Sequence, residues 1–438
     1  TAVTLACGAT QSGFGRTGTV DWQTGDIKTS TFTPVSGQGF FVDTNGGAIT
    51  ANLPAGTAGS IVSFQDYRNT FDTHGLTIIP NGSQKINGGA GQVLLQTEGE
   101  GITLVYVDST VGWRSIQDNV FADVGSNFIA ATGGTESDSG DDRIHTFTGP
   151  GTFAVTSVSP CAANNLVSYM VVAGGAGSGG MTPNCNGGGG GGGAGGFREV
   201  KSPVTPYTAS PLCGHGTPGN RITVTATSFP ITVGGGGDGK QSNNCVGGSG
   251  SNSQFSTIIA AGGGGGGTGN CGSPARNGVA GGSGGGGGSG PATAGAGNTP
   301  PVTPSQGNSG GTSGGSPYAA GGGGGATVAG TNSGPAAQSG PGGAGATTSI
   351  TGSPVAYAGG GGGGGRTPSP AGGVTHGTGG TGGGGRGQGP DNAGAGGTVN
   401  TGGGAGGGVP SATPGPIPAA GQGFNGGSGI VVIRYKRQ

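Results

Sequence analysis

Charged residues are scarce in this chain of 438 residues, since Lys, Arg, Asp and Glu together supply 8% of it and the formal net charge is −1. A nucleic-acid-binding domain presents a basic surface, so this composition argues against nucleic acid as a partner. It also argues against electrostatic attachment to a membrane. Because no run of about 18 apolar residues is present, we expect no transmembrane helix and no membrane insertion.

Catalytic signatures are also missing. The chain has four histidines, and none of them (His74, His145, His215 and His376) lies in a recognisable catalytic motif. The glycine runs are not phosphate-binding loops, because no Gly-Lys-Ser or Gly-Lys-Thr follows them. Paired carboxylates for glycoside hydrolysis need no local motif, but 17 acidic residues are a thin supply. We expect a protein that is not an enzyme and needs no cofactor.

The six cysteines contain no CxxC pair, which argues against a zinc ribbon. Five of them fall within residues 161–271, namely Cys161, Cys185, Cys213, Cys245 and Cys271. Free thiols and one or two disulfides among these five both remain open, because sequence cannot choose among the possible pairings. A disulfide would stabilise a glycine-rich region mainly by restricting the unfolded chain.

Glycine is the residue that dominates, and it divides the chain in two. Of the 119 glycines, 24 lie in residues 1–150 and 95 in residues 151–438, about one residue in three. Glycine loses the most backbone entropy on folding and has no side chain to bury. The second part must therefore gain its cohesion in some way other than an ordinary hydrophobic core.

The first part has the pattern of a β-rich module. Short apolar or alternating stretches such as Ala48–Leu53, Ser60–Phe64 and Ile102–Val107 are separated by turn signals such as Asn45-Gly46-Gly47. No helix of convincing length is indicated. We predict an attachment segment at 1–35, a small β-sandwich or barrel at 36–121, a linker at 122–143 and a glycine-rich domain at 144–438. In the linker, Glu136, Asp138, Asp141 and Asp142 are interpreted as a solvated loop, with calcium binding as the alternative.

The glycine runs allow three interpretations. A flexible linker is one, and collagen is excluded because glycine does not recur strictly at every third residue. The third is a bundle of polyglycine II helices, which have three residues per turn and can hydrogen-bond only to their neighbours. Short apolar leads precede several runs, and a flexible spacer has no use for them. We therefore predict an ordered bundle framed by strands, with these leads at one end: Val171–Ala173, Ile231–Val233, Ile258–Ala261, Tyr318–Ala320 and Val355–Ala358.

Several motifs resemble known virus proteins. The glycine-rich part is similar to the glycine-rich domain of phage structural proteins, notably those of marine phages, and residues 40–113 resemble a β-module of phage virion proteins. The first resemblance rests on Ile144-His-Thr-Phe-Thr-Gly-Pro-Gly-Thr-Phe-Ala-Val155, Tyr169-Met-Val-Val-Ala-Gly-Gly175 and Gly427-Ser-Gly-Ile-Val-Val-Ile-Arg-Tyr435. The second rests on Phe41-Val-Asp-Thr44, Phe64-Gln-Asp-Tyr-Arg-Asn-Thr-Phe71 and Thr103-Leu-Val-Tyr-Val-Asp108.

The resemblance implies a virion surface protein on the capsid or tail, extracellular after release. It would be a fibre or adhesin, similar to the glycine-rich adhesins at the tips of some tail fibres, and would bind a host glycan or outer-membrane protein. It implies contact with other virion proteins through the N-terminal segment, and a homotrimer. A head fibre, a capsid decoration protein or a tail connector without receptor contact is the first alternative, and a secreted cell-surface filament is the second.

Under the binding interpretation, receptor contacts come from the loops between glycine runs, because loops on a rigid scaffold commonly carry recognition. Aromatic residues and arginine are the usual anchors of such contacts. The candidates are Tyr207, His215, Arg276, Arg366, His376 and Arg386. For each, the alternative is a solvated loop residue without a partner.

Overall fold

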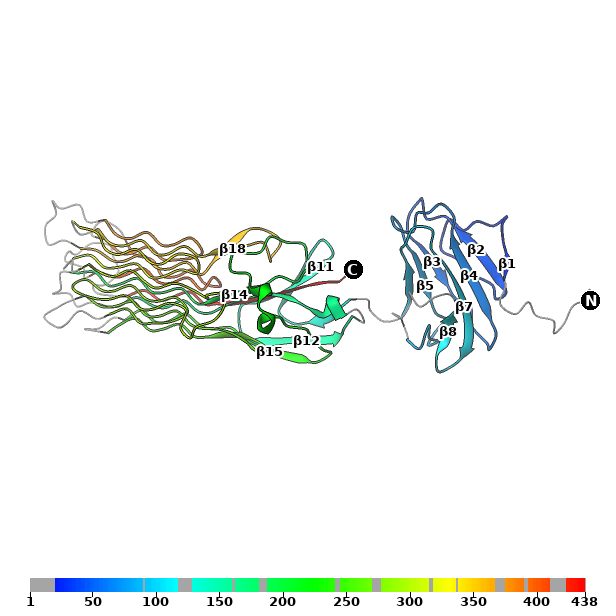
Figure 1. Cartoon of the computed structure of the whole chain (residues 1–438), viewed down its shortest axis with the longest axis horizontal. Helices are drawn as coiled ribbons and strands as arrows, with labels where there is room; N and C mark the ends of the chain where they lie inside the picture. Colours follow the sequence, from blue (N-terminus) through cyan, green and yellow to red (C-terminus); the bar gives the residue numbers. More distant parts are fainter. Residues whose placement is uncertain are drawn as a thin grey trace, which may run out of the picture. The chain divides into compact units, whose positions relative to one another are not determined.

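The computed structural model describes residues 20–437 except position 90 and the intervals 117–127, 160–161, 181–186, 241–244, 270–276, 315–317, 336–337, 367–374, 390–392 and 410–422. The chain forms two compact units, residues 1–127 and 128–438 (Figure 1). The described part is almost entirely β and irregular, as expected, with only short 3-10 helices. None of its helices has the length and apolar character to cross a membrane.

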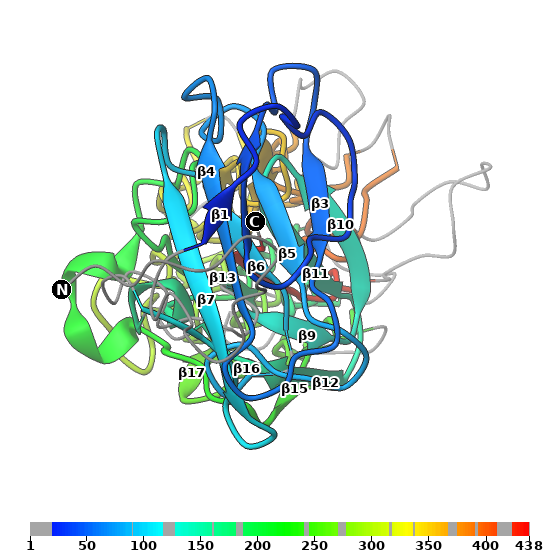
Figure 2. The ribbon, with the colours of Figure 1, turned by 90° about the vertical axis from the view of Figure 1, so that its right-hand side faces the viewer.

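The first unit consists of two sheets that enclose one core (Figures 1 and 2). The first sheet has the order β1 (Asp21–Trp22), β2 (Gln38–Val42), β4 (Ile61–Asp66), β7 (Gly101–Asp108) and β8 (Gly112–Ser115). The second has the order β3 (Ile49–Asn52), β5 (Leu76–Ile79) and β6 (Val93–Leu95). This arrangement agrees with the predicted two-layer β-module.

Strands β2, β3, β4 and β5 alternate between the two sheets, whereas β1 lies beside β2, β6 beside β5 and β8 beside β7 in the same sheet. β1 pairs with β2, β2 with β4, and β3 with β5, all in parallel register. The period of two along each strand turns alternate residues inward. Ile49 lies beside Leu76 and Ala51 beside Ile78, and all four are buried. Trp113 fills the same core and is fully buried.

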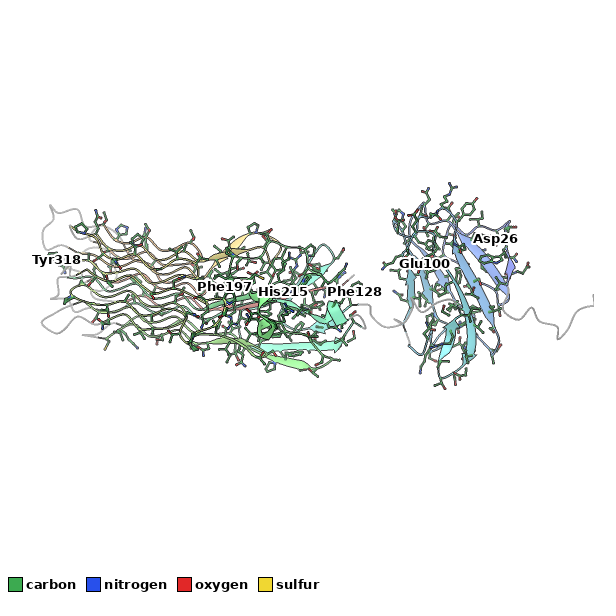
Figure 3. All side chains as sticks on the ribbon, in the orientation of Figure 1. Asp26, Glu100, Phe128, Phe197, His215 and Tyr318 are labelled. Carbon is green, nitrogen blue, oxygen red and sulfur yellow. The ribbon has the colours of Figure 1, made fainter. Side chains whose placement is uncertain are left out.

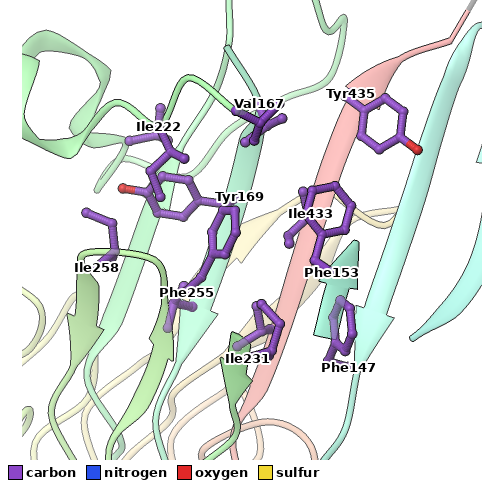
Figure 4. Close-up of a cluster of buried hydrophobic side chains, with 14 of the residues drawn as sticks. Phe147, Phe153, Val167, Tyr169, Ile222, Ile231, Phe255, Ile258, Ile433 and Tyr435 are labelled. Atoms are coloured by element: carbon purple, nitrogen blue, oxygen red, sulfur yellow. The ribbon is translucent and has the colours of Figure 1, made fainter. Parts of the chain in front are cut away.

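The second unit begins with two antiparallel five-stranded sheets. One has the order β10 (Thr135–Ser139), β11 (Asp142–Phe147), β20 (Ile430–Lys436), β13 (Ser168–Val172) and β14 (Phe197–Val200). The other has the order β17 (Ile258–Ala260), β16 (Ser253–Phe255), β15 (Ser228–Thr232), β12 (Gly151–Ser157) and β9 (Ala130–Thr132). Their facing side chains form an aromatic-rich core in which Phe255 lies 6.1 Å from Phe153 and 5.9 Å from Tyr169, between ring centroids (Figure 4).

Strand β20 lies in the middle of its sheet, between β11 and β13. Val431 and Ile433 point into the core between the sheets, whereas Ile430 and Val432 face a second apolar cluster on the opposite side. The short hairpin of β18 (Ala346–Thr348) and β19 (Val355–Tyr357) contributes to that cluster. Burial on both faces explains why β20 is a continuous apolar run, Ile-Val-Val-Ile, instead of an alternating one.

Several strands run directly into glycine segments that lie side by side as a bundle (Figure 1). In the segment 187–196, the backbone N–H groups donate to three neighbouring segments in strict rotation. Gly189, Gly192 and Gly195 donate to residues 408, 405 and 402, and the two residues after each donate to two other segments. This repeat of three is the symmetry of a polyglycine II helix.

The same segment accepts hydrogen bonds from three further segments, through residues 173–176, 283–289 and 361–364. It therefore contacts six neighbours, and its described N–H groups from 189 to 196 are all satisfied by the backbone of other segments. Such an approach leaves no space for side chains: a Cβ at Gly191 would lie 2.1 Å from the Gly361 carbonyl oxygen. The lattice of hydrogen bonds replaces the hydrophobic core in this part of the chain.

Side-chain amides complete the lattice where the backbone of a neighbouring segment does not supply a carbonyl acceptor. Asn252, Asn277 and Asn332 accept hydrogen bonds from the backbone N–H groups of Gly262, Thr293 and Thr312, at 2.8–2.9 Å. Asn425 and Gln388 serve Gly239 and Val409 in the same way, at 2.8 and 3.0 Å. The polar residues among the glycines are therefore part of the lattice and not mere spacers.

Two predicted boundaries are wrong. The expected linker 122–143 contains β9, β10 and the start of β11, because β10 pairs with β11 along its whole length. The expected attachment segment 1–35 contributes residues 20–35 to the first unit, where β1 pairs with β2 and Phe32 bridges to Ala51. Residues 1–19 lie outside the described part.

The apolar leads mostly occupy the expected place, in or beside strands β13, β15, β17 and β19 at the strand end of the bundle. The exception is the lead at 318–320, which was predicted at the same end. Tyr318 lies at the opposite end, where its carbonyl accepts a hydrogen bond from Arg366 N–H (Figure 3).

The lattice predicts a sharp difference between two glycines. Gly191→Ala should destabilise the second unit by about 2 kcal/mol or more, because the added methyl group overpacks a site with no room to give. Gly235→Ala should be neutral or slightly stabilising, since nothing lies within 4 Å of its Cβ position and alanine restricts the unfolded chain. Thermal unfolding of the two variants checks this, and equal melting temperatures would contradict the close packing.

Candidate functional site

Several intervals outside the described residues have their flanking residues at one end of the glycine bundle. The backbone joins their flanks across the bundle: Gly180 N–H donates to Cys245, Gly189 N–H to Gly408, and Gly365 N–H to Gln388. Strands β13, β14 and β20 lie at the other end (Figure 1). The name loop end is used here for residues 178–180, 187–189, 245–247, 267–269, 318–320, 364–366, 375–377, 386–389, 407–409 and 423–425.

Three of the candidate residues come together at the loop end. Arg366, His376 and Arg386 lie on three segments that are direct neighbours, since Gly377 N–H donates to Gly363 and Gly387 N–H donates to Gly377, both at 2.9 Å. Arg386 is exposed, and its Nε donates to the Ala393 carbonyl at 2.9 Å. Arg366 and His376 are half-buried. The spacing of these residues in the sequence does not indicate that they are neighbours in the structure.

The loop end also has an excess of positive charge. From residue 239 to residue 438, Asp391 is the only acidic residue in the sequence. The glycine segments in that stretch carry Lys240, Arg276, Arg366 and Arg386. Lys240 was not among the candidates; it follows the glycine run 234–237 after Asp238 and Gly239, so an acidic residue lies two positions from it. Arg276 and Asp391 lie outside the described residues.

Of the other two described candidates, His215 lies at the strand end (Figure 3), and Tyr207 packs in the apolar cluster around β20. Tyr207 was predicted to contact a receptor, but it is a core residue: its side chain joins the apolar cluster around β20, and the Arg434 guanidinium lies 5.2 Å from its ring centroid. A buried ring is not available to a partner. His215 is half-buried in the 3-10 helix η3 (Gly214–Gly216), and its carbonyl accepts from Arg221 Nε at 2.8 Å.

Buried charges beside Tyr207 hold the strand end together. Arg434 Nε donates to Asp142 at 2.7 Å, and both side chains are almost fully buried. Glu199 accepts from the Ser210 N–H at 2.8 Å and from the Thr348 hydroxyl at 2.5 Å. Burial raises the pKa of Glu199 above its usual value, and the hydrogen bonds from Ser210 and Thr348 oppose this only in part. These groups have a structural role, because they link strands that are far apart in the sequence.

The acidic segment is not the solvated loop that the sequence suggested. Glu136 and Asp138 lie on β10 and form ion pairs with Arg143, and Asp138 also pairs with Arg437 at 2.7 Å. Asp142 is buried against Arg434. Within the described part of the chain, no group of three or more acidic, His or Cys side chains is placed to hold a metal ion.

The cysteine pairing stays open. Cys213 has a free thiol whose sulfur accepts from the Lys201 N–H at 3.4 Å. Cys245 is exposed at the loop end. Cys7, Cys161, Cys185 and Cys271 lie outside the described residues.

A family model described as a glycine-rich domain matches residues 146–436, which include β12 to β20 and the glycine segments, whereas β9, β10 and most of β11 precede the match. No curated protein matches the chain.

The raised pKa of Glu199 gives a pH dependence with a definite sign. The folded state favours the protonated carboxyl, so its contribution to stability is complete below the usual pKa and is lost as pH rises through the folded value. Glu199→Gln should therefore raise the melting temperature of the second unit at pH 8 and should flatten the decrease of that melting temperature as pH rises. Glu98→Gln, at an exposed position in the first unit, serves as the matched control. A steeper fall in the Glu199 variant would show the opposite sign.

Proposed function

We propose a function for a chain that belongs to the glycine-rich domain family over residues 146–436. It is a bacteriophage virion surface protein, a fibre or adhesin whose loop end attaches the particle to a host cell. The phage assignment is supported by the resemblance of residues 40–113 and 144–435 to phage virion proteins. The attachment role is supported by the architecture of the second unit.

One observation carries the proposal: the hydrogen-bond lattice holds the described residues on either side of several undescribed intervals at a single end. Each segment between the strand end and the loop end is held by its neighbours, as the six contacts of segment 187–196 illustrate. A rigid base reduces the entropy that loops lose when they bind. Glycines at the loop end are packed as closely as the interior ones, since a Cβ at Gly188 would lie 1.8 Å from the Gly364 carbonyl oxygen. The close packing of the lattice therefore extends to the loop end.

The excess of cations at the loop end is the second support. Exposed arginines are frequent anchors of specific contacts, and positive charge speeds the encounter with an anionic cell surface. Arg366 and Arg386 provide positive charges on two segments that neighbour the segment of His376. The surface they meet is proposed to be a host glycan or an outer-membrane protein.

The N-terminal segment is proposed to connect to the particle. The resemblance implies contacts with other virion proteins near the N-terminus and a homotrimeric fibre. Light scattering coupled to size-exclusion chromatography gives the number of chains directly, and a mass of three chains is the expected result.

The attachment role can be tested on the full chain. The variant Arg366→Ala/His376→Ala/Arg386→Ala should bind intact host cells at least tenfold more weakly and should compete less well with the virus for adsorption. Arg221→Ala provides a matched control, because it removes an exposed arginine at the strand end. Binding is measured by flow cytometry of the labelled protein, with melting temperatures to confirm that each variant is folded.

The outcomes separate the proposed function from its main alternative. Saturable binding by the wild-type chain that the triple variant loses would support an adhesin. A folded wild-type chain that neither binds host cells nor blocks adsorption would refute the receptor role and favour a head fibre, a decoration protein or a tail connector. Equal binding by the triple variant would move the contact away from these three residues.

A further inference from the structure

The first unit presents a row of three aromatic side chains on the outer face of its larger sheet. Trp22 lies on β1, Phe41 on β2, and Tyr67 follows directly after β4. The ring centroid of Trp22 is 5.0 Å from that of Phe41, and Phe41 is 6.4 Å from Tyr67. The row therefore crosses three adjacent strands instead of following one.

This row is not part of the core. On β2 the neighbouring residues Phe40 and Val42 are buried at 3% and 0% exposure, which turns Phe41 outward. Trp22 and Tyr67 are 39% and 45% exposed to solvent. Trp113, the other tryptophan of the chain, is fully buried. The unit can thus bury a tryptophan, and it leaves Trp22 on the surface beside two other rings.

The sheet holds the row in a fixed geometry. Parallel pairing sets Trp22 opposite Gly39 and Phe41 opposite Gln65. A Cβ at Gly39 would lie 2.6 Å from Val20 Cγ2 and 2.8 Å from Trp22 Cδ2. The glycine therefore allows the indole ring to lie flat against β2, next to Phe41. Aromatic side chains with only two rotatable bonds lose little entropy on binding, and the sheet reduces the loss further.

Polar and charged groups lie around the three rings, and the charges of Asp43 and Arg68 cancel. The Arg68 guanidinium lies 5.6 Å from the Tyr67 ring centroid, and its Nε donates to Asp43 at 2.7 Å. Gln65 sits beside Phe41 in the register of the sheet. Asp43 supplies acceptors and Arg68 supplies donors, and Gln65 supplies its Oε1 as a further acceptor while its Nε2 donates to the Gly99 carbonyl at 2.9 Å. Because Asp43 and Arg68 neutralise one another, the row favours an uncharged ligand over a polyanion or a polycation.

We propose that Trp22, Phe41 and Tyr67 form a binding site for a neutral polysaccharide. The apolar CH faces of sugar rings stack on aromatic faces, and their hydroxyl groups find donors and acceptors at Arg68, Asp43 and Gln65. The rings follow one another at about the spacing of adjacent strands, ~5 Å, so successive sugar units of a chain can occupy them in turn. A second copy of the protein fits less well, since a stable interface buries about 800 Å² per partner and depletes charged residues at its centre.

The two tryptophans make the full chain its own reporter. Soluble dextran, galactomannan and a xylan fragment serve as neutral probes, with dextran sulfate as the charged comparison. Binding of a neutral probe should shield Trp22 from quenching by acrylamide, whereas the buried Trp113 contributes a constant, protected background. A panel of neutral oligosaccharides on a glycan array extends the same test to other sugars.

Substitutions identify the row as the site. Trp22→Ala and Tyr67→Ala should each weaken binding about tenfold, which corresponds to about 1.4 kcal/mol. Val35→Ala is the matched control, because Val35 is an apolar residue with 59% exposure outside the row. If Trp22→Ala alters the edge strand, Tyr67→Ala and the quenching of the unmodified chain still decide the question.

Three results would overturn the proposal. The first is that no neutral glycan shields Trp22. The second is that Trp22→Ala and Val35→Ala bind glycan with equal affinity. The third is that Trp22 is shielded in the absence of sugar and loses this shielding on dilution, which would indicate self-association. The proposal does not depend on the function of the loop end. The triple variant Arg366→Ala/His376→Ala/Arg386→Ala should therefore keep full glycan binding at the aromatic row.

Discussion

Backbone hydrogen bonding between chain segments without side chains is the interaction on which the second unit depends. A peptide group inside the bundle has no water and no helix or sheet partner, so a neighbouring segment must satisfy it. Glycine permits this close approach, as at Gly191 and Gly361, although buried alanines such as Ala194 and Ala405 also take part in the lattice. The long glycine runs, the rotation of donors every three residues and the asparagines that accept lone N–H groups all follow from this one requirement.

The two β-sheets at the strand end make the lattice possible, because glycine alone offers no hydrophobic stabilisation to offset its loss of entropy. Phe153, Tyr169 and Phe255 supply a conventional core, and β13, β14 and β20 lead from that core into the glycine segments. The strands fix the positions of the first residues in each segment, and the lattice then extends that order to the loop end. Side-chain packing thus orders the strands, and the strands in turn position the glycine segments that are continuous with them for backbone packing.

Local pattern predicted much of this arrangement, and long-range contacts account for what it missed. The apolar leads at 171–173, 231–233, 258–261 and 355–358 indicated strands at one end of a polyglycine II bundle, since each combines β-forming residues with a glycine run. The lead at 318–320 has the same pattern but lies at the other end of the bundle. Which end a lead occupies depends on the path of the chain through the bundle, and the local sequence does not specify that path. Tyr207 resembled an exposed anchor because its partner Arg434 is over 200 residues away, and the acidic strand β10 resembled a loop because Arg143 and Arg437 neutralise it.

The position of β20 has a consequence for how the protein is made. This strand fills the place between β11 and β13, yet the ribosome synthesises it only after every glycine segment has emerged. Until then the central sheet has an open gap, and the strand end cannot close around its core. The second unit must therefore complete its folding after translation has passed residue 436, and a chaperone that shields the exposed edges of β11 and β13 during that interval would protect the newly made chain from aggregation.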